Sequence, residues 1–212
     1  MSSARILYLL SGSIACYKSC HVISRLVQAG HEVQTICTSG ASRFIGPATL
    51  EGLTGRPVLA DVFEPGHMMA HIHLARWADL VVLAPASASA INRLSQGLAE
   101  DLVGALFLAH DWKKPFMLAP AMNEAMLKHP ATQESLERLS RWGVRVLPTA
   151  SGHQACGTDG EGRFLEPEQL LSYIEEALKI PCESGSRLAA PRSLSTRFVS
   201  SPISVPAGRE PP

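Results

Sequence analysis

Two short apolar runs of this chain end in the same tripeptide, and this repetition constrains the fold more than any other feature. Leu80–Ala84 and Phe116–Ala119 have the length and apolar character of fully buried strands, and Ala-Pro-Ala closes each run. Because proline cannot donate a ladder hydrogen bond, each strand is expected to stop there, before a polar segment that opens a helix. In an open α/β sheet, ligands bind beyond the carboxyl ends of the strands. The two endings therefore predict two walls of one pocket.

Further elements can be assigned from apolar runs, helical periodicity and glycine or proline stops. We expect strands over 5–10, 32–38 and 144–147, a strand or extended piece over 58–63, and helices that run to about 28 and over 46–54, 91–94, 98–109, 132–142 and 165–180. The glycine-rich segment 149–166 has few large apolar residues and is predicted to be a surface loop of the kind that forms lids. Cys156 lies in this segment, so we do not expect it to pack in the core.

The composition excludes several classes of protein. The chain has 212 residues, 46% of them hydrophobic, which is ample for one domain with a real core. Its 19 basic residues balance 19 acidic ones, so there is no electrostatic reason to expect nucleic acid or an anionic membrane as a partner. No apolar run approaches the roughly 18 residues of a membrane span, and the N-terminus lacks the order of a signal peptide. We therefore expect a cytoplasmic protein.

The cysteines and histidines indicate neither a disulfide framework nor a metal centre. The five cysteines are an odd number without paired C-x-x-C units. Cys16 and Cys20 stand four residues apart on one helical face, where small core residues are expected. His67, His71 and His73 match no standard zinc spacing, so we predict that the chain holds no metal.

The first predicted strand runs through Ser11-Gly12-Ser13 into a helix. This arrangement places backbone N–H groups and small hydroxyl groups at a helix N-terminus, which is a ready site for a phosphate group. The small polar residues Thr38-Ser39-Gly40 follow the second strand in the same way. Only Gly12 of the dinucleotide fingerprint G-x-G-x-x-G is present, which argues against a nicotinamide-dependent dehydrogenase.

Asn123 follows the second Ala-Pro-Ala and admits two interpretations. Asn is a common N-cap residue and can satisfy a helix N–H group without touching a ligand. Asn123 and Met126 also lie beyond the carboxyl end of a predicted strand, where a ligand would bind. The segment taken alone favours the N-cap.

The composition changes at Pro181. Residues 181–212 hold six of the fifteen prolines, seven serines and no sustained periodicity. Such a segment cannot bury enough apolar surface to fold, so we predict a disordered tail. We expect the chain to consist of one folded domain over 4–180 and this tail over 181–212.

Several motifs, taken in order, resemble those of the homo-oligomeric flavin-containing cysteine decarboxylases, and among them the phosphopantothenoylcysteine decarboxylases of coenzyme A synthesis. The motifs are SGSIACYK near the start, His71-Ile72 before RWADLVVLAP, the PASASA loop, PAMNEAM, and ACGTDGEGR. The resemblance covers about residues 4–180. It implies an α/β fold with a flavodoxin-like doubly wound parallel sheet in three α/β/α layers, a bound FMN and assembly as homotrimers.

The resemblance also implies roles for individual residues. His71 resembles the active-site base, and Cys156 resembles the cysteine that supplies a proton late in the reaction. Asn123 and Met126 match the family's substrate motif. Contacts to FMN are implied for the small residues of four loops, namely Gly12, Ser13, Ile14, Thr38, Ser87, Ala88, Ser89, Ala90 and Ala121.

Three positions depart from the family pattern. Ser89 stands where the PASANT motif has Asn, and Leu127 stands where the PxMNxxMW motif has Trp. Thr158 stands where the last loop commonly reads CGD, although an acid follows at Asp159. These changes bear on the identity of the substrate more than on flavin binding.

The implied activity is FMN-dependent decarboxylation of 4′-phosphopantothenoylcysteine to 4′-phosphopantetheine, a carboxy-lyase reaction of coenzyme A biosynthesis. Direct loss of CO₂ from a cysteine-derived carboxylate would leave a carbanion without an electron sink, and flavin solves this by oxidising the C–S unit to a thioaldehyde. After CO₂ has left, the enethiol is reduced again, with Cys156 as the proton donor. His71 has the pKa range of a base, and Asn123 has amide donors for the substrate carboxylate.

Two other functions are kept open. An oxidative decarboxylase of C-terminal peptidyl cysteine would keep the fold and change the substrate, and Ser89 and Leu127 motivate this alternative. A non-catalytic flavin-binding regulatory subunit would carry His71 and Asn123 as relics and engage a partner through residues 181–212. Ligation of cysteine to phosphopantothenate would need a second folded domain, which we expect on another polypeptide.

Overall fold

The structure, a computed structural model, describes residues 3–60, 69–153, 157 and 159–179. All of these residues belong to one compact unit of the chain, Met1–Cys182. The predicted tail over 181–212 lies outside the described residues, as do His67, Cys156 and Thr158, so the expectations for them stay predictions.

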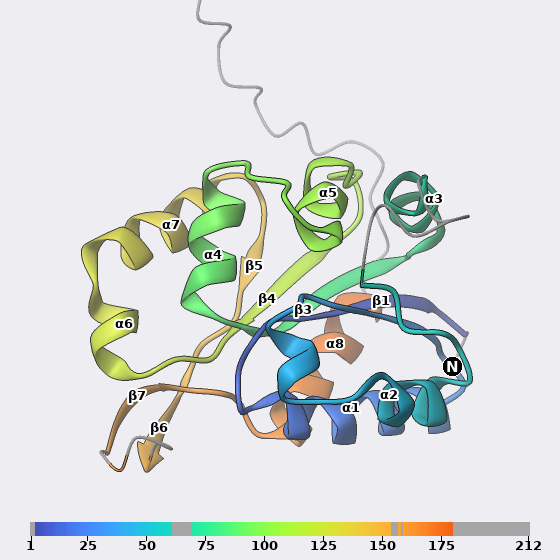
Figure 1. The fold of residues 1–212 in the computed structure, drawn as a ribbon, viewed down its shortest axis with the longest axis horizontal. Coiled ribbons are helices and arrows are strands. Elements are labelled where there is room, and N and C mark those ends of the chain that lie inside the picture. The colour runs from blue at the N-terminus through green and yellow to red at the C-terminus, as the bar shows by residue number, and fades with distance from the viewer. Residues whose placement is uncertain (1–2, 61–68, 154–156, 158, 180–212) are drawn as a thin grey trace, which may run out of the picture. The chain divides into compact units, whose positions relative to one another are not determined.

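Five parallel strands form the main sheet, in the order β2-β1-β3-β4-β5 (Figure 1). The strands are β1 (Arg5–Leu10), β2 (Glu32–Cys37), β3 (Leu80–Ala86), β4 (Phe116–Pro120) and β5 (Arg145–Val146). The chain starts inside the sheet, adds β2 on one side and then winds outward on the other, which is the flavodoxin-like order. The predicted doubly wound parallel sheet is therefore confirmed.

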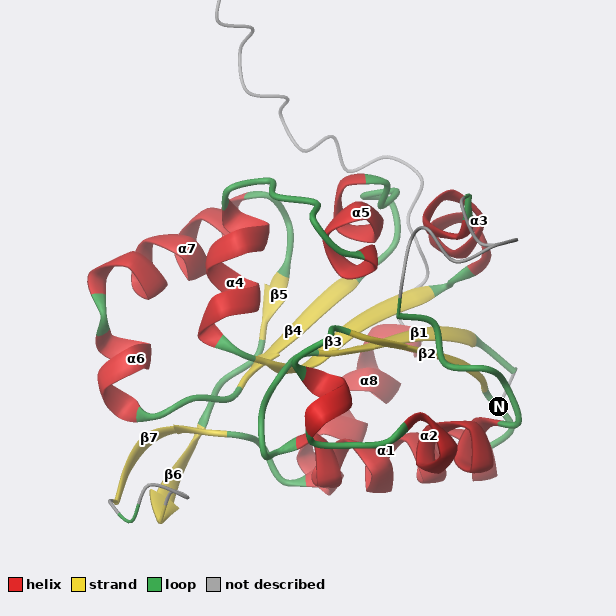
Figure 2. Ribbon diagram, in the orientation of Figure 1, coloured by secondary structure: helices red, strands yellow, loops and turns green. Residues whose placement is uncertain are grey.

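Helices cover both faces of this sheet and give three layers (Figure 2). One face carries α1 (Cys16–Gln28), α2 (Pro47–Thr54) and α8 (Pro167–Lys179), and the other carries α3 (Ala70–Trp77), α4 (Ala88–Ser95), α5 (Leu102–Leu108) and α7 (Pro130–Arg141). The short helices η1 (Ala41–Arg43) and α6 (Glu124–Lys128) follow β2 and β4. None of the helices in the described ranges is long and apolar enough to cross a membrane.

The sheet separates two hydrophobic clusters, because successive side chains of a strand point to opposite faces. Ile6, Tyr8 and Leu10 pack against the α1 side, whereas Leu7 and Leu9 pack against the other side. All five side chains are completely buried. Burial on both faces explains why these strands read as continuous apolar runs and not as alternating patterns.

The strand expected to stop at Pro85 continues through it. β3 includes Pro85 and Ala86, and Ala86 pairs with Pro120 after a shift in register. The peptide bond before Pro85 is cis. Pro85 lacks an N–H group, but its carbonyl oxygen accepts hydrogen bonds from Ser11, so the chain stays in the sheet two residues further than the sequence suggested.

Two helix limits also differ from the expected ones, and side-chain caps explain both. The helix expected over 91–94 begins at Ala88, because the Ser87 hydroxyl accepts the N–H group of Ala90. The helix expected over 98–109 begins only at Leu102, because the Asp101 carboxylate accepts the N–H group of Gly104 at 2.9 Å. The residues Ala88–Ala90, expected in a loop, thus form a helical turn.

The segment expected to be a surface loop contains an antiparallel hairpin. β6 (Ala150–His153) pairs with β7 (Asp159–Arg163), and the pair forms a small separate sheet. Its strands consist mostly of glycine and polar residues, so they show no alternation of apolar and polar side chains. The prediction of a loop is wrong for these residues, whereas 154–156 and 158 lie outside the described part.

Smaller differences concern the ends of other elements. The second strand ends at Cys37 and not at 38, and the strand expected over 144–147 shortens to the two residues of β5. The piece expected over 58–63 contributes a single bridge between Leu59 and Ile36 in the described part. Cys16 is buried, as expected of a core residue, whereas Cys20 is partly exposed at the rim of the core.

Candidate functional site

The loops after β1 and β2 lie in direct backbone contact at the carboxyl edge of the main sheet. A Cβ atom added to Gly12 would lie 3.1 Å from the carbonyl carbon of Gly40. Thr38 follows β2 and is buried, and its hydroxyl oxygen accepts the N–H group of Ala41 at 3.2 Å. Gly12 and Thr38, both implied in flavin binding, therefore belong to one tightly packed surface.

Ser11 joins the loop after β1 to the loop after β3. Its hydroxyl donates to the carbonyl oxygen of Pro85 at 2.8 Å and accepts the N–H group of Ser87 at 2.7 Å. Ser11 is almost completely buried, so these bonds are shielded from water. We did not assign a role to Ser11 from the sequence, although the strand–Ser-Gly-Ser–helix pattern is a signal for such a residue.

The N-terminus of α1 has no side-chain cap. The Ser13 hydroxyl accepts the N–H group of Ala15 at 3.2 Å, and α1 then runs for 13 residues. The N–H groups of the first turn of a helix attract anions, and the helix dipole adds to this attraction. The phosphate site expected at this end of the sheet stays a prediction, and the side chain of Ile14, next to Ser13 in the chain, is exposed.

Residues 87–90 form the start of α4 and not a loop. Ser87 is the N-cap, Ala88 and Ala90 are buried, and Ser89 is exposed. The side chains of this first turn are all small. The hydroxyl group of Ser89 faces the surface, where the family pattern has a larger amide.

The loop after β4 is also hydrogen-bonded to its neighbours at this edge of the sheet. The N–H group of Ala121 donates to the carbonyl oxygen of Ala86 at 2.9 Å, and the N–H group of Met122 donates to that of Gly162 at the same distance. Hydrogen bonds therefore join the loops after β1, β3 and β4 and strand β7 side by side. The structure thus brings together the predicted flavin residues of four loops and the Asn123 segment.

Asn123 is the N-cap of α6, and its Oδ1 atom accepts the N–H group of Met126 at 2.8 Å. The structural interpretation of Asn123 is therefore correct. It does not exclude the functional one, because the cap uses only the oxygen of the amide and Asn123 is exposed. Met126 is also exposed, to 46%.

His71 lies on α3, which packs beside α5 and away from the hairpin (Figure 1). Its side chain is partly buried, and among the described residues its Nδ1 atom has no hydrogen-bond partner. Within the described part of the chain, no hydrogen bond or ion pair joins His71 to the loops that hold Gly12, Ser87 or Asn123. The structure therefore leaves the predicted base apart from the predicted substrate residues of its own chain.

Burial favours the neutral thiol form of three cysteines. Burial raises the pKa of the Cys16 and Cys20 thiols, and it raises that of Cys37 to about 12. These thiols are therefore protonated at neutral pH and poor nucleophiles. Across 3–60, 69–153, 157 and 159–179, no three side chains of His, Cys, Asp or Glu come together as metal ligands would.

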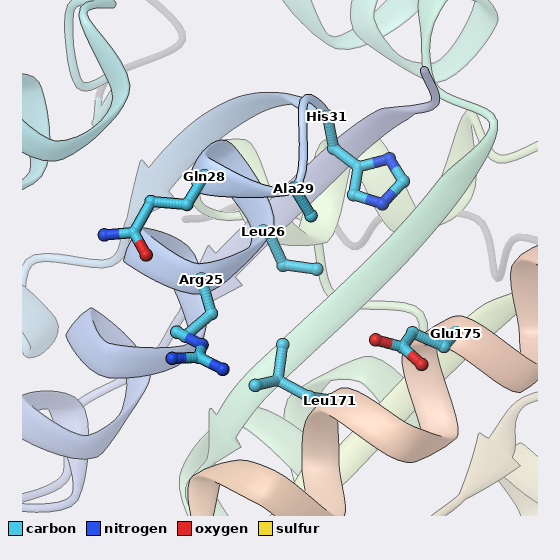
Figure 3. Close-up of a pocket in the computed structure, with 7 residues that line it drawn as sticks. All are labelled: Arg25, Leu26, Gln28, Ala29, His31, Leu171 and Glu175. Atoms are coloured by element: carbon cyan, nitrogen blue, oxygen red, sulfur yellow. The ribbon is translucent and has the colours of Figure 1, made fainter. Parts of the chain in front are cut away.

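A pocket of about 400 Å³ lies at the other edge of the sheet (Figure 3). It opens between the C-terminal end of α1 and helix α8, and it is lined by Arg25, Leu26, Gln28, Ala29, His31, Leu171 and Glu175. The Nδ1 atom of His31 accepts the N–H group of Ala4, just before β1, at 3.2 Å. The pocket therefore belongs to the amino ends of the strands and not to the site described above.

The chain is similar to known flavoproteins over its whole described length. A model of the Flavoprotein family matches residues 1–179. The coenzyme A biosynthesis bifunctional protein CoaBC of Vibrio parahaemolyticus is 43% identical over 178 residues, which are 83% of this chain and 44% of that protein. The chain thus spans less than half the length of the first curated relatives that it matches.

Two solved structures agree with this result. A PPC decarboxylase mutant complexed with pantothenoylaminoethenethiol has a TM-score of 0.73 at 28% identity, over 84% of this chain and 100% of that one. The FMN binding protein AtHal3 has a TM-score of 0.71 at 29% identity, over 82% of this chain and 96% of that one.

These matches confirm the resemblance that the motifs predicted. The strand order is that of a flavodoxin-like sheet, and the matching family is one of flavoproteins. The family match extends from the first strand to the last described helix. The chain therefore belongs to the Flavoprotein family.

Proposed function

We propose that this protein is an FMN-dependent carboxy-lyase that converts 4′-phosphopantothenoylcysteine to 4′-phosphopantetheine in coenzyme A biosynthesis. The observation that carries the proposal is the series of joined loops that runs from an uncapped helix N-terminus, at α1, to the exposed amide of Asn123. Support for the substrate comes from the relatives. One acts in coenzyme A biosynthesis, and a PPC decarboxylase was solved with pantothenoylaminoethenethiol.

FMN fits the small residues around these loops. We propose that the first turn of α1 binds the phosphate and that the remaining contacts come from the loops after β1, β2, β3 and β4, through Gly12, Ser13, Ile14, Thr38, Ser87, Ala88, Ser89, Ala90 and Ala121. When bound, FMN supplies a two-electron acceptor for the C–S unit of the substrate, without which the loss of CO₂ has no electron sink. A relative of similar fold is an FMN binding protein.

Asn123 is proposed to orient the substrate carboxylate. Its Oδ1 atom is held by the N–H group of Met126, so the amide nitrogen faces away from α6 and can donate to an oxygen of the substrate. The exposed side chain of Met126 gives the substrate an apolar contact on the same turn. The cap thus fixes the orientation of the group that binds.

Two proton transfers remain. We propose that His71 takes a proton during oxidation of the substrate, since an imidazole has the pKa range of a general base. We propose that Cys156, in the segment between β6 and β7, gives the proton that completes the saturated thiol. The two electrons that FMN accepted from the C–S unit would return to the enethiol together with this proton, so the net reaction would be a decarboxylation without oxidation.

The proposed assembly is a homotrimer in the cytoplasm, with a small cysteine-containing molecule as substrate. Light scattering of the flavin-loaded protein measures the mass in solution directly. A mass of three chains, or of a multiple of three, supports the proposal, and a monomer contradicts it.

The activity has a direct test. Purified protein is expected to be yellow, and with FMN bound it is expected to release CO₂ from 4′-phosphopantothenoylcysteine. A His71→Asn variant should keep the flavin spectrum and release no CO₂. Colourless protein, or flavin-loaded protein that leaves the substrate intact, contradicts the proposal.

One observation favours a second candidate, an oxidative decarboxylase of C-terminal peptidyl cysteine. Leu127 lies on α6 directly after Met126, where the family pattern has Trp, and the smaller side chain leaves more room beside the exposed face of that helix. A peptide that ends in cysteine would then give an enethiol, which is two hydrogens lighter than the saturated thiol. Incubation with such a peptide and mass analysis of the product separate the two candidates.

A further inference from the structure

Strand β7 lies directly on the loop that carries Asn123. The N–H group of Met122 donates to the carbonyl oxygen of Gly162 at 2.9 Å. A Cβ atom on Gly162 would lie 2.6 Å from the carbonyl oxygen of Met122 and 3.4 Å from that of Asn123, so the two backbones touch. The position of Met122, and of Asn123 after it, is therefore set by β7.

The end of β7 is held in turn by an ion pair with the first turn of α1. Both carboxylate oxygens of Glu166 accept hydrogen bonds from the Lys18 ammonium group at 2.9 Å. Arg163, the last residue of β7, donates to the same carboxylate at 2.6 Å. Between them, Phe164 and Leu165 are buried and fix the chain in the core. Three charges thus meet where β7 leaves its hairpin.

This ion pair differs from the exposed pairs on the surface. The Lys18 side chain is only 10% exposed, whereas the Glu166 side chain is 43% exposed. A buried ammonium group needs its partner, whereas a fully exposed pair contributes little. The Lys18 ammonium lowers the pKa of the Glu166 carboxyl group, which therefore stays charged at neutral pH.

Lys18 also connects the pair to the cofactor end of the site. It lies three residues after Ala15, the N-cap of α1, in the turn whose N–H groups suit a phosphate. We propose that the Lys18–Glu166 ion pair is a positioning pair, which fixes β7 against α1 and so fixes the Met122–Asn123 loop relative to the bound cofactor. Its consequence for the substrate rests on the proposed function, whereas its effect on the loop does not.

Amide hydrogen exchange at Met122 tests the positioning. Replacing Glu166 with Ala removes the carboxylate, and in the FMN-loaded protein the Met122 amide is then expected to exchange about tenfold faster or more, because its acceptor on β7 moves. The matched control is Glu176→Ala. Glu176 lies on α8 and forms an ion pair at 2.6 Å with Arg145 of β5, and neither residue belongs to β7. The control should leave the exchange at Met122 unchanged.

A second variant guards against a folding defect. Lys18→Met keeps the buried stem and removes the charge, and it should accelerate exchange at Met122 as Glu166→Ala does, while the amides of Leu9 and Val82 in the core strands keep the rate of the parent. Equal rates at Met122 in all variants overturn the proposal. A uniform acceleration that includes Leu9 and Val82 also overturns it, since it indicates general loss of stability.

The kinetic arm uses 4′-phosphopantothenoylcysteine. Glu166→Ala is expected to raise KM about tenfold and to change kcat less, because Asn123 binds the substrate but does not take part in bond breaking. Faster exchange with unchanged KM overturns the role in substrate positioning. If the parent does not act on this substrate, the proposed function fails, and the exchange rates still decide whether the pair positions the loop.

Discussion

Replacing Gly162 with Ala should destabilise the protein and displace the loop that carries Asn123. Gly162 has a φ of +97°, and a positive φ costs a residue with a side chain about 1–2 kcal/mol. The added Cβ atom would lie 2.6 Å from the carbonyl oxygen of Met122, and a backbone atom cannot rotate away. Relief of this contact would break the hydrogen bond between Met122 and Gly162, which contributes about 1 kcal/mol. The sum predicts a loss of about 2–3 kcal/mol.

Thermal unfolding of the FMN-loaded protein measures this loss. For a domain of this size, 2–3 kcal/mol corresponds to a decrease in Tm of roughly 4–12 °C. Gly52→Ala is the matched control, because it adds the same methyl group inside α2 with nothing within 4 Å of the new atom. In a helix interior Ala is favoured over Gly by roughly 0.5–1 kcal/mol, so the control should unfold at a higher temperature than the parent.

The two substitutions must therefore shift the Tm in opposite directions. If Gly162→Ala unfolds at the temperature of the parent, the close contact between β7 and the Met122 loop is refuted. If both variants lose the same stability, the effect belongs to the loss of a glycine in general and not to this contact.

Three further predictions concern other parts of the fold. Gly12→Ala places a methyl group 3.1 Å from the backbone of Gly40, so the loops after β1 and β2 must move apart. Fluorescence titration should therefore show FMN binding that is weaker by about tenfold. Equal affinity would count against a flavin site at these loops. Asp101→Ala removes the cap on the Gly104 N–H group and should lower the free energy of unfolding, measured in urea, by about 1–2 kcal/mol. Asp101→Asn should retain most of the stability. Equal losses in both variants would exclude the cap as the cause. Burial lowers the pKa of His110, so below its ordinary value of about 6.5 the unfolded state binds a proton that the folded state does not. The free energy of unfolding should therefore fall as the pH decreases below that value, by up to about 1.4 kcal/mol per pH unit. Urea unfolding at high and low pH should show a smaller fall in His110→Gln than in the parent. Identical falls would contradict the assignment to His110.

The main sheet could be predicted from the sequence because its strands are buried on both faces. Leu80–Ala84 and Phe116–Ala119 are apolar at every position, as strands that are covered on both faces are expected to be. Periodicity could not supply the order of the strands, which came from the family resemblance. The loops at their ends lie next to one another, since the carboxyl ends of parallel strands meet at one edge of a sheet.

The hairpin and its contacts could not be predicted in the same way. β6 and β7 lack an alternating apolar face, so the local signal for a strand is absent. Lys18 and Glu166 are 148 residues apart in the chain, and no local pattern relates them. The contact between Gly162 and Met122 likewise depends on the fold as a whole. Nothing in the sequence distinguishes Gly162 from the other glycines of its segment.

Asn123 shows that an N-cap role does not exclude a role in ligand binding. The sequence favoured an N-cap, and the structure confirms it at 2.8 Å. The same hydrogen bond holds the amide so that its nitrogen remains for a ligand, which keeps the functional role as a proposal. A local rule that treats a cap and a binding residue as alternatives is therefore too strict for an amide side chain, which has both an acceptor and donors.

The mass of the product formed from 4′-phosphopantothenoylcysteine by the FMN-loaded protein tests the central claim most directly. We expect the parent to give the saturated thiol, and a Cys156→Ser variant to stop at the enethiol, which is two hydrogens lighter. Unchanged substrate in the presence of bound flavin, or an enethiol as the final product of the parent, would contradict the proposed role in coenzyme A biosynthesis.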